Sequence, residues 1–102
     1  MAFSGNFMCT SFKVELMQAV HNFTASTGNT FKLALYTSSA TIDANTTAYS
    51  STNEVSGTNY TAGGNTLTGF SITGTGSTAR LDFSSTSWTT ATITARGAMI
   101  YN

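Results

Sequence analysis

The side chains of this sequence that could do chemistry are few and far apart. His21 is the only histidine, and the acidic residues are Glu15, Asp43, Glu54 and Asp82. A catalytic triad needs a nucleophile, a base and an orienting acid in fixed geometry. Glu15 precedes His21 by six residues, so no acid stands at helical spacing from the histidine. We interpret His21 as a surface or half-buried side chain, and the spacing predicts no catalytic residue.

The acidic residues also lack the spacing of a metal site or a hydrolase. Two carboxylates would act as general acid and base only if folding brought them together. Asp43-x-Asn45 is too short for a calcium loop and lacks its later glutamate, so calcium stays open without support. The stretch Ala62-Gly63-Gly64-Asn65 lacks the lysine of a phosphate-binding loop and indicates a turn. We expect no cofactor and no metal ion, and predict that the chain is not an enzyme.

The single cysteine, Cys9, limits the redox and metal chemistry further. One cysteine excludes an intrachain disulfide and a cysteine-based metal site, and we interpret Cys9 as a small buried apolar side chain. No apolar run is long enough to cross a bilayer, and the N-terminus has neither a basic segment nor a cleavage pattern. We therefore expect no membrane partner and folding in the cytoplasm.

The element around which the others are built is the stretch 31–36. Phe31, Leu33 and Leu35 alternate there with Lys32, Ala34 and Tyr36. A strand places alternate side chains on opposite faces, so the pattern predicts a strand that buries its three large apolar residues in the core. The polar run 37–52 that follows indicates a surface excursion with a short turn of helix near Asp43.

Residues 11–23 are predicted to form one amphipathic helix. Apolar residues recur three and four positions apart, as on one face of a helix; they are Phe12, Leu16, Ala19, Val20 and Phe23. Thr10 or Ser11 is expected to cap the first turn through its hydroxyl. Val14 and Met17 lie beside this stripe, so the helix is expected to contact its own sheet and a second surface.

The second half of the chain indicates several short strands. Residues 67–73 form one candidate, with Gly69 placed where a bulge would correct a slip in the alternation. Residues 79–83 predict a half-buried strand that pairs with it as a hairpin. In the last segment Ile93 and Ala95 alternate with polar residues, and residues 98–101 are apolar on both faces. Either a neighbouring subunit covers this edge or the native chain is longer.

These elements predict one structural domain over residues 1–102. It consists of an N-terminal arm at 1–9, the helix at 11–23 and a β-rich region at 30–102. The expected fold class is mainly β: a small antiparallel β-sandwich or barrel-like domain with one N-terminal amphipathic helix packed on it.

Charge is scarce in this chain. Charged residues make up 8% of the sequence, and four basic and four acidic residues give a formal net charge of zero. No long-range field exists to attract nucleic acid, so we expect no nucleic-acid partner. Zero net charge also removes repulsion between identical copies, which favours a homo-oligomer over the alternative of a sticky monomer.

Several stretches together carry a family resemblance. They are Ser11-Phe12-Lys13-x-Glu15-Leu16, Phe31-Lys32-Leu33-Ala34-Leu35-Tyr36-Thr37, Thr47-Ala48-Tyr49, Asn53-Glu54-Val55-Ser56-Gly57-x-x-Tyr60-Thr61-Ala62-Gly63-Gly64, Trp88, and Ala91-Thr92-Ile93-x-Ala95-Arg96-Gly97-Ala98. Through these residues the chain resembles a family of small proteins encoded among the virion genes of tailed bacteriophages. The similarity runs from about residue 11 to residue 102.

The resemblance implies a non-enzymatic structural protein of the virion, assembled in the host cytoplasm. The first expectation is a capsid decoration or cement protein, whose partner is the major capsid protein. The alternative is a tail or tail-fibre component, such as a receptor- or carbohydrate-binding module that uses Trp88 or the loops between Tyr49 and Tyr60 as a stacking platform.

The residues agree with a role in protein–protein contacts. A neutral, hydroxyl-rich surface with aromatic anchors suits copies docked on a protein lattice, where aromatic side chains bury much area and weak contacts add up. The predicted interface residues are Phe3, Phe7, Met8, Val14, Met17, Trp88, Met99, Ile100 and Tyr101.

Overall fold

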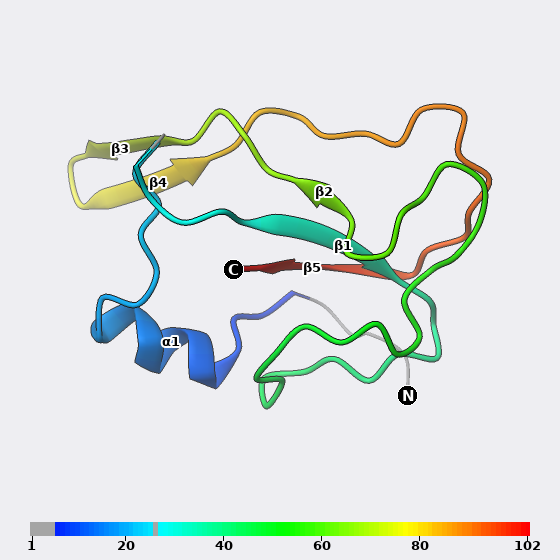
Figure 1. Ribbon diagram of the computed structural model, residues 1–102. Coiled ribbons are helices and arrows are strands. Elements are labelled where there is room, and N and C mark those ends of the chain that lie inside the picture. The colour runs from blue at the N-terminus through cyan, green and yellow to red at the C-terminus, as the bar shows by residue number, and fades with distance from the viewer. Residues whose placement is uncertain (1–5, 26) are drawn as a thin grey trace.

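The computed structural model describes residues 6–25 and 27–102 (Figure 1). Its elements are α1 (Thr10–Met17), β1 (Lys32–Tyr36), β2 (Asn65–Thr66), β3 (Ser71–Thr75), β4 (Thr78–Asp82) and β5 (Gly97–Tyr101). The paired strands in the described ranges are antiparallel. The prediction of a mainly β chain with one N-terminal helix is confirmed. No helix in these ranges is long and apolar enough to span a bilayer.

β1 is the middle strand of a three-stranded sheet in the order β2-β1-β5. All five residues of β1 pair with β5, whereas only Lys32 and Leu33 pair with β2. At the other end of β1, on the residue Tyr36, an isolated bridge joins the strand to Glu54. Figure 1 shows α1 and the loops after β1 on the side of this sheet away from the β3–β4 hairpin. The strand predicted at residues 31–36 is therefore present, at the centre of the fold.

The most buried side chains of β1 are not those that its alternation predicts. Ala34 and Tyr36 are 0% and 1% exposed, whereas Leu33 and Leu35 are only half-buried. Both faces of β1 are covered, so the alternation of large apolar residues does not identify the deeper face. The predicted core face is right for Phe31, which is 2% exposed, and wrong for the two leucines.

The run 37–52 covers this deeper face and is not only a surface excursion. Ala40 is buried against Ala34 and Tyr36, and Ile42 and Tyr49 pack on the same cluster. The Tyr36 hydroxyl donates a hydrogen bond to the Ser50 carbonyl at 2.7 Å, which satisfies its polar end inside the core. A turn is present near Asp43, where the Thr46 N–H bonds to the Asp43 carbonyl, but it is not part of a helix as predicted.

α1 ends at Met17 and not at residue 23 as predicted. Ala19 has a φ of +60°, and its N–H bonds to the Leu16 carbonyl while the Val20 N–H bonds to the Glu15 carbonyl. This pair of hydrogen bonds is the Schellman motif, which glycine usually closes. An alanine in the left-handed region costs about 1–2 kcal/mol and gives the sequence no stop signal.

The start of α1 also differs from the prediction. Cys9 is the N-cap residue and makes no side-chain capping bond. The Thr10 N–H donates to the Ala44 carbonyl at 2.8 Å, and the Ser11 hydroxyl donates to the Thr46 carbonyl at 3.2 Å. The loop after β1 therefore holds the first turn, and the predicted hydroxyl cap is wrong.

A row of phenylalanine rings connects α1 to both sheets. Phe12 contacts Phe23 with ring centroids 6.4 Å apart, and Phe23 stacks on Phe31 at 4.3 Å. Phe31 contacts Phe70 at 5.7 Å, and Phe70 meets Phe83 edge-on at 4.7 Å. Phe12 belongs to α1, and the other four rings lie just outside the regular elements, so the row joins the helix, β1 and the hairpin without close packing of their backbones.

β3 and β4 form the predicted hairpin, but both strands are exposed along their whole length. The burial predicted for residues 79–83 is therefore wrong for residues 79–82, which are exposed, and right for Phe83, which is half-buried. The candidate strand at 67–73 is wrong for residues 67–70 and right for residues 71–73, since β2 ends at Thr66 and β3 begins at Ser71. Gly69 has a φ of +65° and lies in the connection between these strands, outside any paired strand, so it is not the bulge within a strand that was predicted.

Candidate interaction surfaces

Large apolar side chains are exposed around the N-terminal helix. The exposed fractions range from 42% for Phe7 to 82% for Met17. We use the name N-terminal apolar surface for a set of exposed side chains, which are Phe7, Met8, Val14, Leu16, Met17 and Val20. It includes the predicted interface residues Phe7, Met8, Val14 and Met17, and their side chains are open to solvent as a contact would require.

The orientation of α1 explains why so much apolar surface is outside. One face of α1 contacts the rest of the chain through three residues. Ser11 bonds to the Thr46 carbonyl, Phe12 joins the aromatic row, and Glu15 contacts His21. Two of these three residues are polar. The predicted stripe is therefore wrong for Leu16 and Val20, which are 46% and 49% exposed, and α1 has no buried residue.

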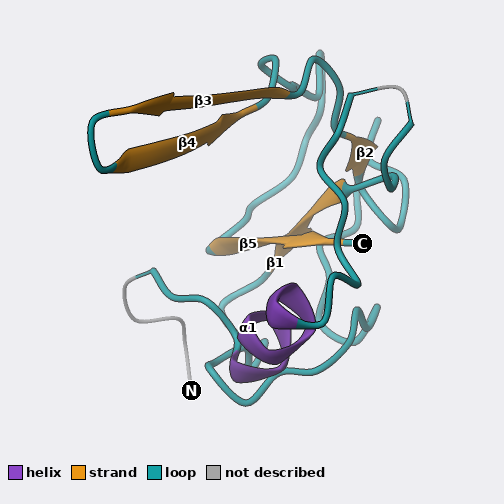
Figure 2. Ribbon diagram, turned by 90° about the vertical axis from the view of Figure 1, so that its left-hand side faces the viewer, coloured by secondary structure: helices purple, strands orange, loops and turns teal. Residues whose placement is uncertain are grey.

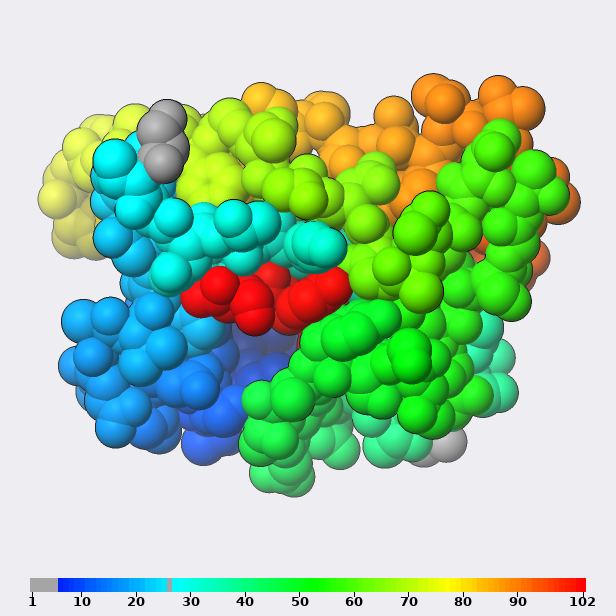
Figure 3. All heavy atoms as spheres, in the orientation of Figure 1, coloured from blue at the N-terminus to red at the C-terminus, as the bar shows by residue number. Residues whose placement is uncertain are grey.

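The C-terminal strand β5 has one exposed and one packed side. Met99 and Tyr101 pack against the cluster of Ala34 and Tyr36, so these two predicted interface residues belong to the core of their own chain. Ile100 lies between them in sequence and is 53% exposed. In Figure 3 the strand lies in a recess between the helix region and the loops after β1. β5 pairs with β1 alone among the described strands, so it is an edge strand of the sheet.

The alternation of Ile93 and Ala95 with polar residues, which predicted a strand in the last segment, does not lie in a strand. β5 begins only at Gly97, and Thr92 joins the fold through a single bridge to Thr58. The predicted interface residue Trp88 is half-buried, with its ring 5.6 Å from that of Tyr60. Phe3, also predicted as an interface residue, lies outside the described residues.

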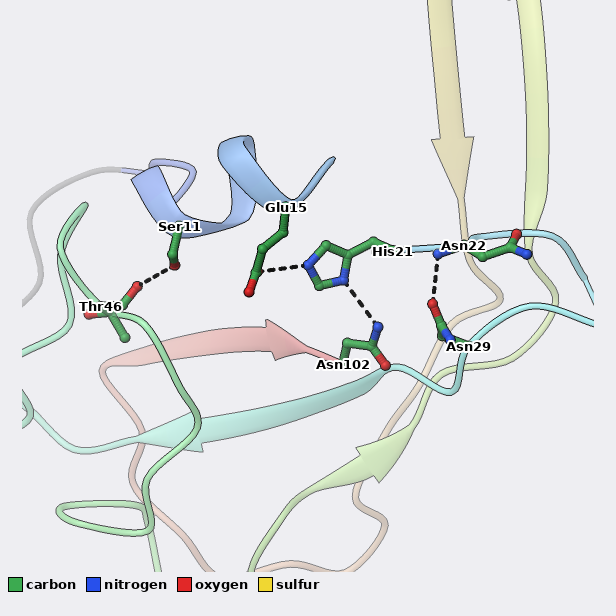
Figure 4. Close-up of polar contacts among 7 residues, drawn as sticks. All are labelled: Ser11, Glu15, His21, Asn22, Asn29, Thr46 and Asn102. Atoms are coloured by element: carbon green, nitrogen blue, oxygen red, sulfur yellow. Dashed lines mark hydrogen bonds and ion pairs between the residues drawn. The ribbon is translucent and has the colours of Figure 1, made fainter. Parts of the chain in front are cut away.

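His21 has a carboxylate partner that the sequence spacing argued against. Because α1 ends early, the chain turns back and the His21 ring lies 3.0 Å from Glu15 Oε1 through Nε2 (Figure 4). The other ring nitrogen, Nδ1, lies 3.0 Å from Asn102 Nδ2. An amide NH₂ can only donate, so Nδ1 accepts and the neutral ring carries its proton on Nε2.

The contacts of His21 hold parts of the chain together and do not form a catalytic triad. Both ring nitrogens of His21 are occupied, so neither is left to take a proton from a nucleophile. Figure 4 shows the Ser11 hydroxyl directed at Thr46, away from the histidine. The contact between His21 and Asn102 joins the segment after α1 to the residue that follows β5, across 81 positions of sequence.

The second polar cluster surrounds Glu54, and sequence reasoning missed it. The Tyr49 and Tyr60 hydroxyls each donate to a different Glu54 oxygen at 2.5 Å, and the Gly63 N–H donates to Oε2 at 2.8 Å. Tyr101 stacks on Tyr49 at 4.5 Å and donates to the Gly63 carbonyl. With Tyr36, all four tyrosines of the chain gather here.

Glu54 and burial change the acidity of the tyrosines around it. Burial, followed by the hydrogen bond to Glu54, raises the pKa of Tyr60 to about 12. Burial, followed by the Glu54 charge, raises the pKa of Tyr36 to about 12. The hydrogen bond to Glu54 and then burial raise the pKa of Tyr49 well above its ordinary value. The phenols therefore stay protonated at neutral pH and act as hydrogen-bond donors.

A shallow hollow of about 350 Å³ lies beside this cluster and is lined mainly by hydroxyl groups. Its lining residues are Thr37, Glu54, Val55, Ser56, Thr92, Ile93 and Thr94. The Glu54 oxygens already accept from two phenols and a backbone N–H, so the carboxylate has a structural function here. Within the described ranges, no group of three or more His, Cys, Asp and Glu side chains could hold a metal ion.

Neither cluster carried a signal in the sequence. Tyr49, Glu54, Tyr60 and Gly63 follow one another at intervals that match no helix or strand period, since loops bring them together. The exposure of Val14 and Met17 was easier to anticipate, because they stand at helical spacing outside the predicted stripe, whereas Leu16 and Val20 were predicted inside it.

Comparisons of the chain with protein-family models, with curated proteins and with solved structures found no match in any of the three.

Proposed function

We propose that this chain is a non-enzymatic structural protein of a tailed-bacteriophage virion, and in particular a capsid decoration or cement protein. The observation that carries the proposal is the N-terminal apolar surface, whose Met17 is 82% exposed on a chain of zero net charge. Exposed apolar patches on small proteins mark protein–protein contact sites. The resemblance of the sequence to small virion proteins supplies the setting, the partner being the major capsid protein.

The remaining groups support a role without chemistry. His21 is held on both nitrogens, and Glu54 is held by phenols and a backbone N–H. These contacts satisfy the polar groups within the chain and leave apolar and hydroxyl groups for a partner. A lattice that offers many equivalent sites then strengthens each weak contact through avidity.

Binding to empty capsids of the phage that encodes the chain tests the proposal. Met17→Lys places a charge in the N-terminal apolar surface and is expected to weaken capsid binding by about tenfold or more, because the charge must be desolvated. Gln18→Lys adds the same charge at the neighbouring exposed position and is the matched control. Particles whose shell carries no density for this chain, or capsids that do not bind it, would refute the proposal.

A tail or tail-fibre module that binds carbohydrate is the second candidate. It is favoured by the contact between Trp88 and Tyr60 beside the hydroxyl-lined hollow, since sugars stack on aromatic rings. Glycan-array binding that is lost in Trp88→Ala, with the fold retained by circular dichroism, would support this candidate over the first. Binding unaffected by Trp88→Ala would contradict it.

A further inference from the structure

The β3–β4 hairpin has one entirely apolar face and one entirely polar face. Its register places Ile72 opposite Leu81 and Gly74 opposite Ala79. Phe70 and Phe83, the next residues outward, continue the same face and are in ring contact. The opposite face carries Ser71, Thr73, Thr75, Thr78, Arg80 and Asp82. Such complete segregation is the pattern of a strand pair with one buried side.

The described residues of the same chain nevertheless leave the outer part of this apolar face exposed. Ile72 is 58% exposed and Leu81 is 37% exposed, although they face each other across the hairpin. In Figure 2 the hairpin extends away from the other elements, with its turn as the far end. Only its base is anchored, by the half-buried Phe70 and Phe83. A two-stranded hairpin without cover is marginally stable in water, so this element gains most from a partner.

The hairpin and α1, which carries Val14, Leu16 and Met17 of the N-terminal apolar surface, lie on opposite sides of the three-stranded sheet. Figures 1 and 2 share a vertical axis, and in both the hairpin is at the top while α1 is at the bottom. One copy cannot bring these two surfaces together. The hairpin of one copy can reach the helix of another in a head-to-tail contact, which covers both surfaces in every copy of a closed ring.

We infer that the apolar face of the β3–β4 hairpin docks on the N-terminal apolar surface of a second copy of this chain. The inference deepens the proposed function and rests on it for its setting. Charge agrees with this partner, because the hairpin charges Arg80 and Asp82 pair with each other at 2.7 Å on the polar face and the chain has zero net charge.

Coverage of both surfaces favours the head-to-tail contact over two hairpins packed face to face. A stable interface buries about 800 Å² on each partner. The open part of the hairpin face consists of Ile72, Leu81, Ala79 and Gly74, since Phe70 already packs on Phe31 and Phe83 packs on Phe70. Two hairpins packed face to face would give each copy a single contact through this face and would leave the N-terminal apolar surface open. A head-to-tail ring gives each copy both contacts.

Sedimentation equilibrium of the full chain over a wide concentration range tests the inference. Ile72→Asp is expected to weaken self-association by about tenfold or more, because it buries a charge in the contact. Thr73→Asp places the same charge on the polar face of the same strand and is expected to leave association unchanged. Both sites are exposed, so circular dichroism should show the same fold. A wild-type chain that stays monomeric throughout, or equal loss in both variants, would overturn the inference.

Cysteine cross-linking in a Cys9→Ser background distinguishes the two geometries. An Ile72→Cys chain mixed with a Met17→Cys chain is expected to form mixed disulfides between different copies, whereas each variant alone is not. Efficient cross-linking of Ile72→Cys with itself would show hairpins face to face and overturn the inference. A monomer that binds capsids would overturn this inference and leave the proposed function standing, and an oligomer that ignores capsids would do the reverse.

Discussion

Among single residues, Glu54 organises the polar interior of this chain. Its carboxylate accepts from Tyr49, Tyr60 and the Gly63 N–H, which all lie in the long connection between β1 and β2. Hydrogen bonds to a charged acceptor are stronger than neutral ones, and a donor left without its acceptor costs free energy. In a chain with only 8% charged residues, this one acid therefore fixes loops that contain little other anchoring.

Replacing Glu54 with glutamine should lower the free energy of unfolding by about 1–3 kcal/mol, because the two phenols lose their charged acceptor. Urea denaturation at neutral pH measures the change. Asp82→Asn is the control, since the Asp82–Arg80 pair is solvent-exposed and removing it should change stability by less than about 1 kcal/mol. Equal losses in the two variants would contradict the central position of Glu54.

The tyrosines also predict how stability responds to alkaline pH. The pKa of Tyr36 and of Tyr60 is about 12 in the folded chain and 10 for the free side chain. A raised pKa means that the folded state favours the protonated phenol, so its contribution is complete below pH 10 and is lost as pH rises toward 12. Urea midpoints between pH 8 and pH 12 should be flat at first and then fall, in parallel with tyrosinate absorbance in the unfolded state. A flat profile to pH 12 would contradict this.

At the scale of elements, the end of α1 decides what the N-terminal region presents to solvent. The reversal at Ala19 stops the helix at Met17 and brings His21 back to Glu15. It also leaves Val20 outside, on the N-terminal apolar surface. A helix continued to residue 23 would have placed Val20 on its predicted inner stripe, so one left-handed residue determines the composition of the surface.

Ala19→Gly should stabilise the chain by about 1 kcal/mol, because glycine adopts a φ of +60° without the clash that alanine suffers. Thermal unfolding followed by circular dichroism measures the shift. Ala44→Gly is the control: Ala44 is exposed in a loop and does not have a positive φ, so glycine there should give no gain. A loss of stability in Ala19→Gly would show that the helix does not end in this motif.

For the whole molecule, the scarcity of charge predicts the salt dependence of self-association. A contact between the apolar hairpin face and the N-terminal apolar surface includes no ion pair to be screened. Raising salt from about 0.05 M to about 0.5 M should therefore leave the association constant unchanged or slightly stronger. Sedimentation at the two salt concentrations measures it, and a marked weakening would point to a charged interface.

Local periodicity predicted where the helix and strands lie better than it predicted which of their side chains are buried. The alternation at 31–36, the hairpin at 71–82 and the helix over Thr10–Met17 depend on neighbouring residues, which the sequence displays directly. Burial depends on what packs on each face from elsewhere. Leu33 and Leu35 are shallower than predicted because loops also cover Ala34 and Tyr36, and Leu81 is open because no described residue covers it. The Glu54 cluster depends on loop geometry, which has no period to detect.

The turn of the hairpin offers a place to mark the molecule genetically. Gly76 has a φ of +61°, and a Cβ built there would meet no atom within 4 Å. A short epitope spliced between Gly76 and Ser77 would extend from the tip without displacing any neighbour. An antibody or gold label bound to that epitope would then test the proposed function, since images of intact particles would show label on the shell, along the tail or nowhere on the particle.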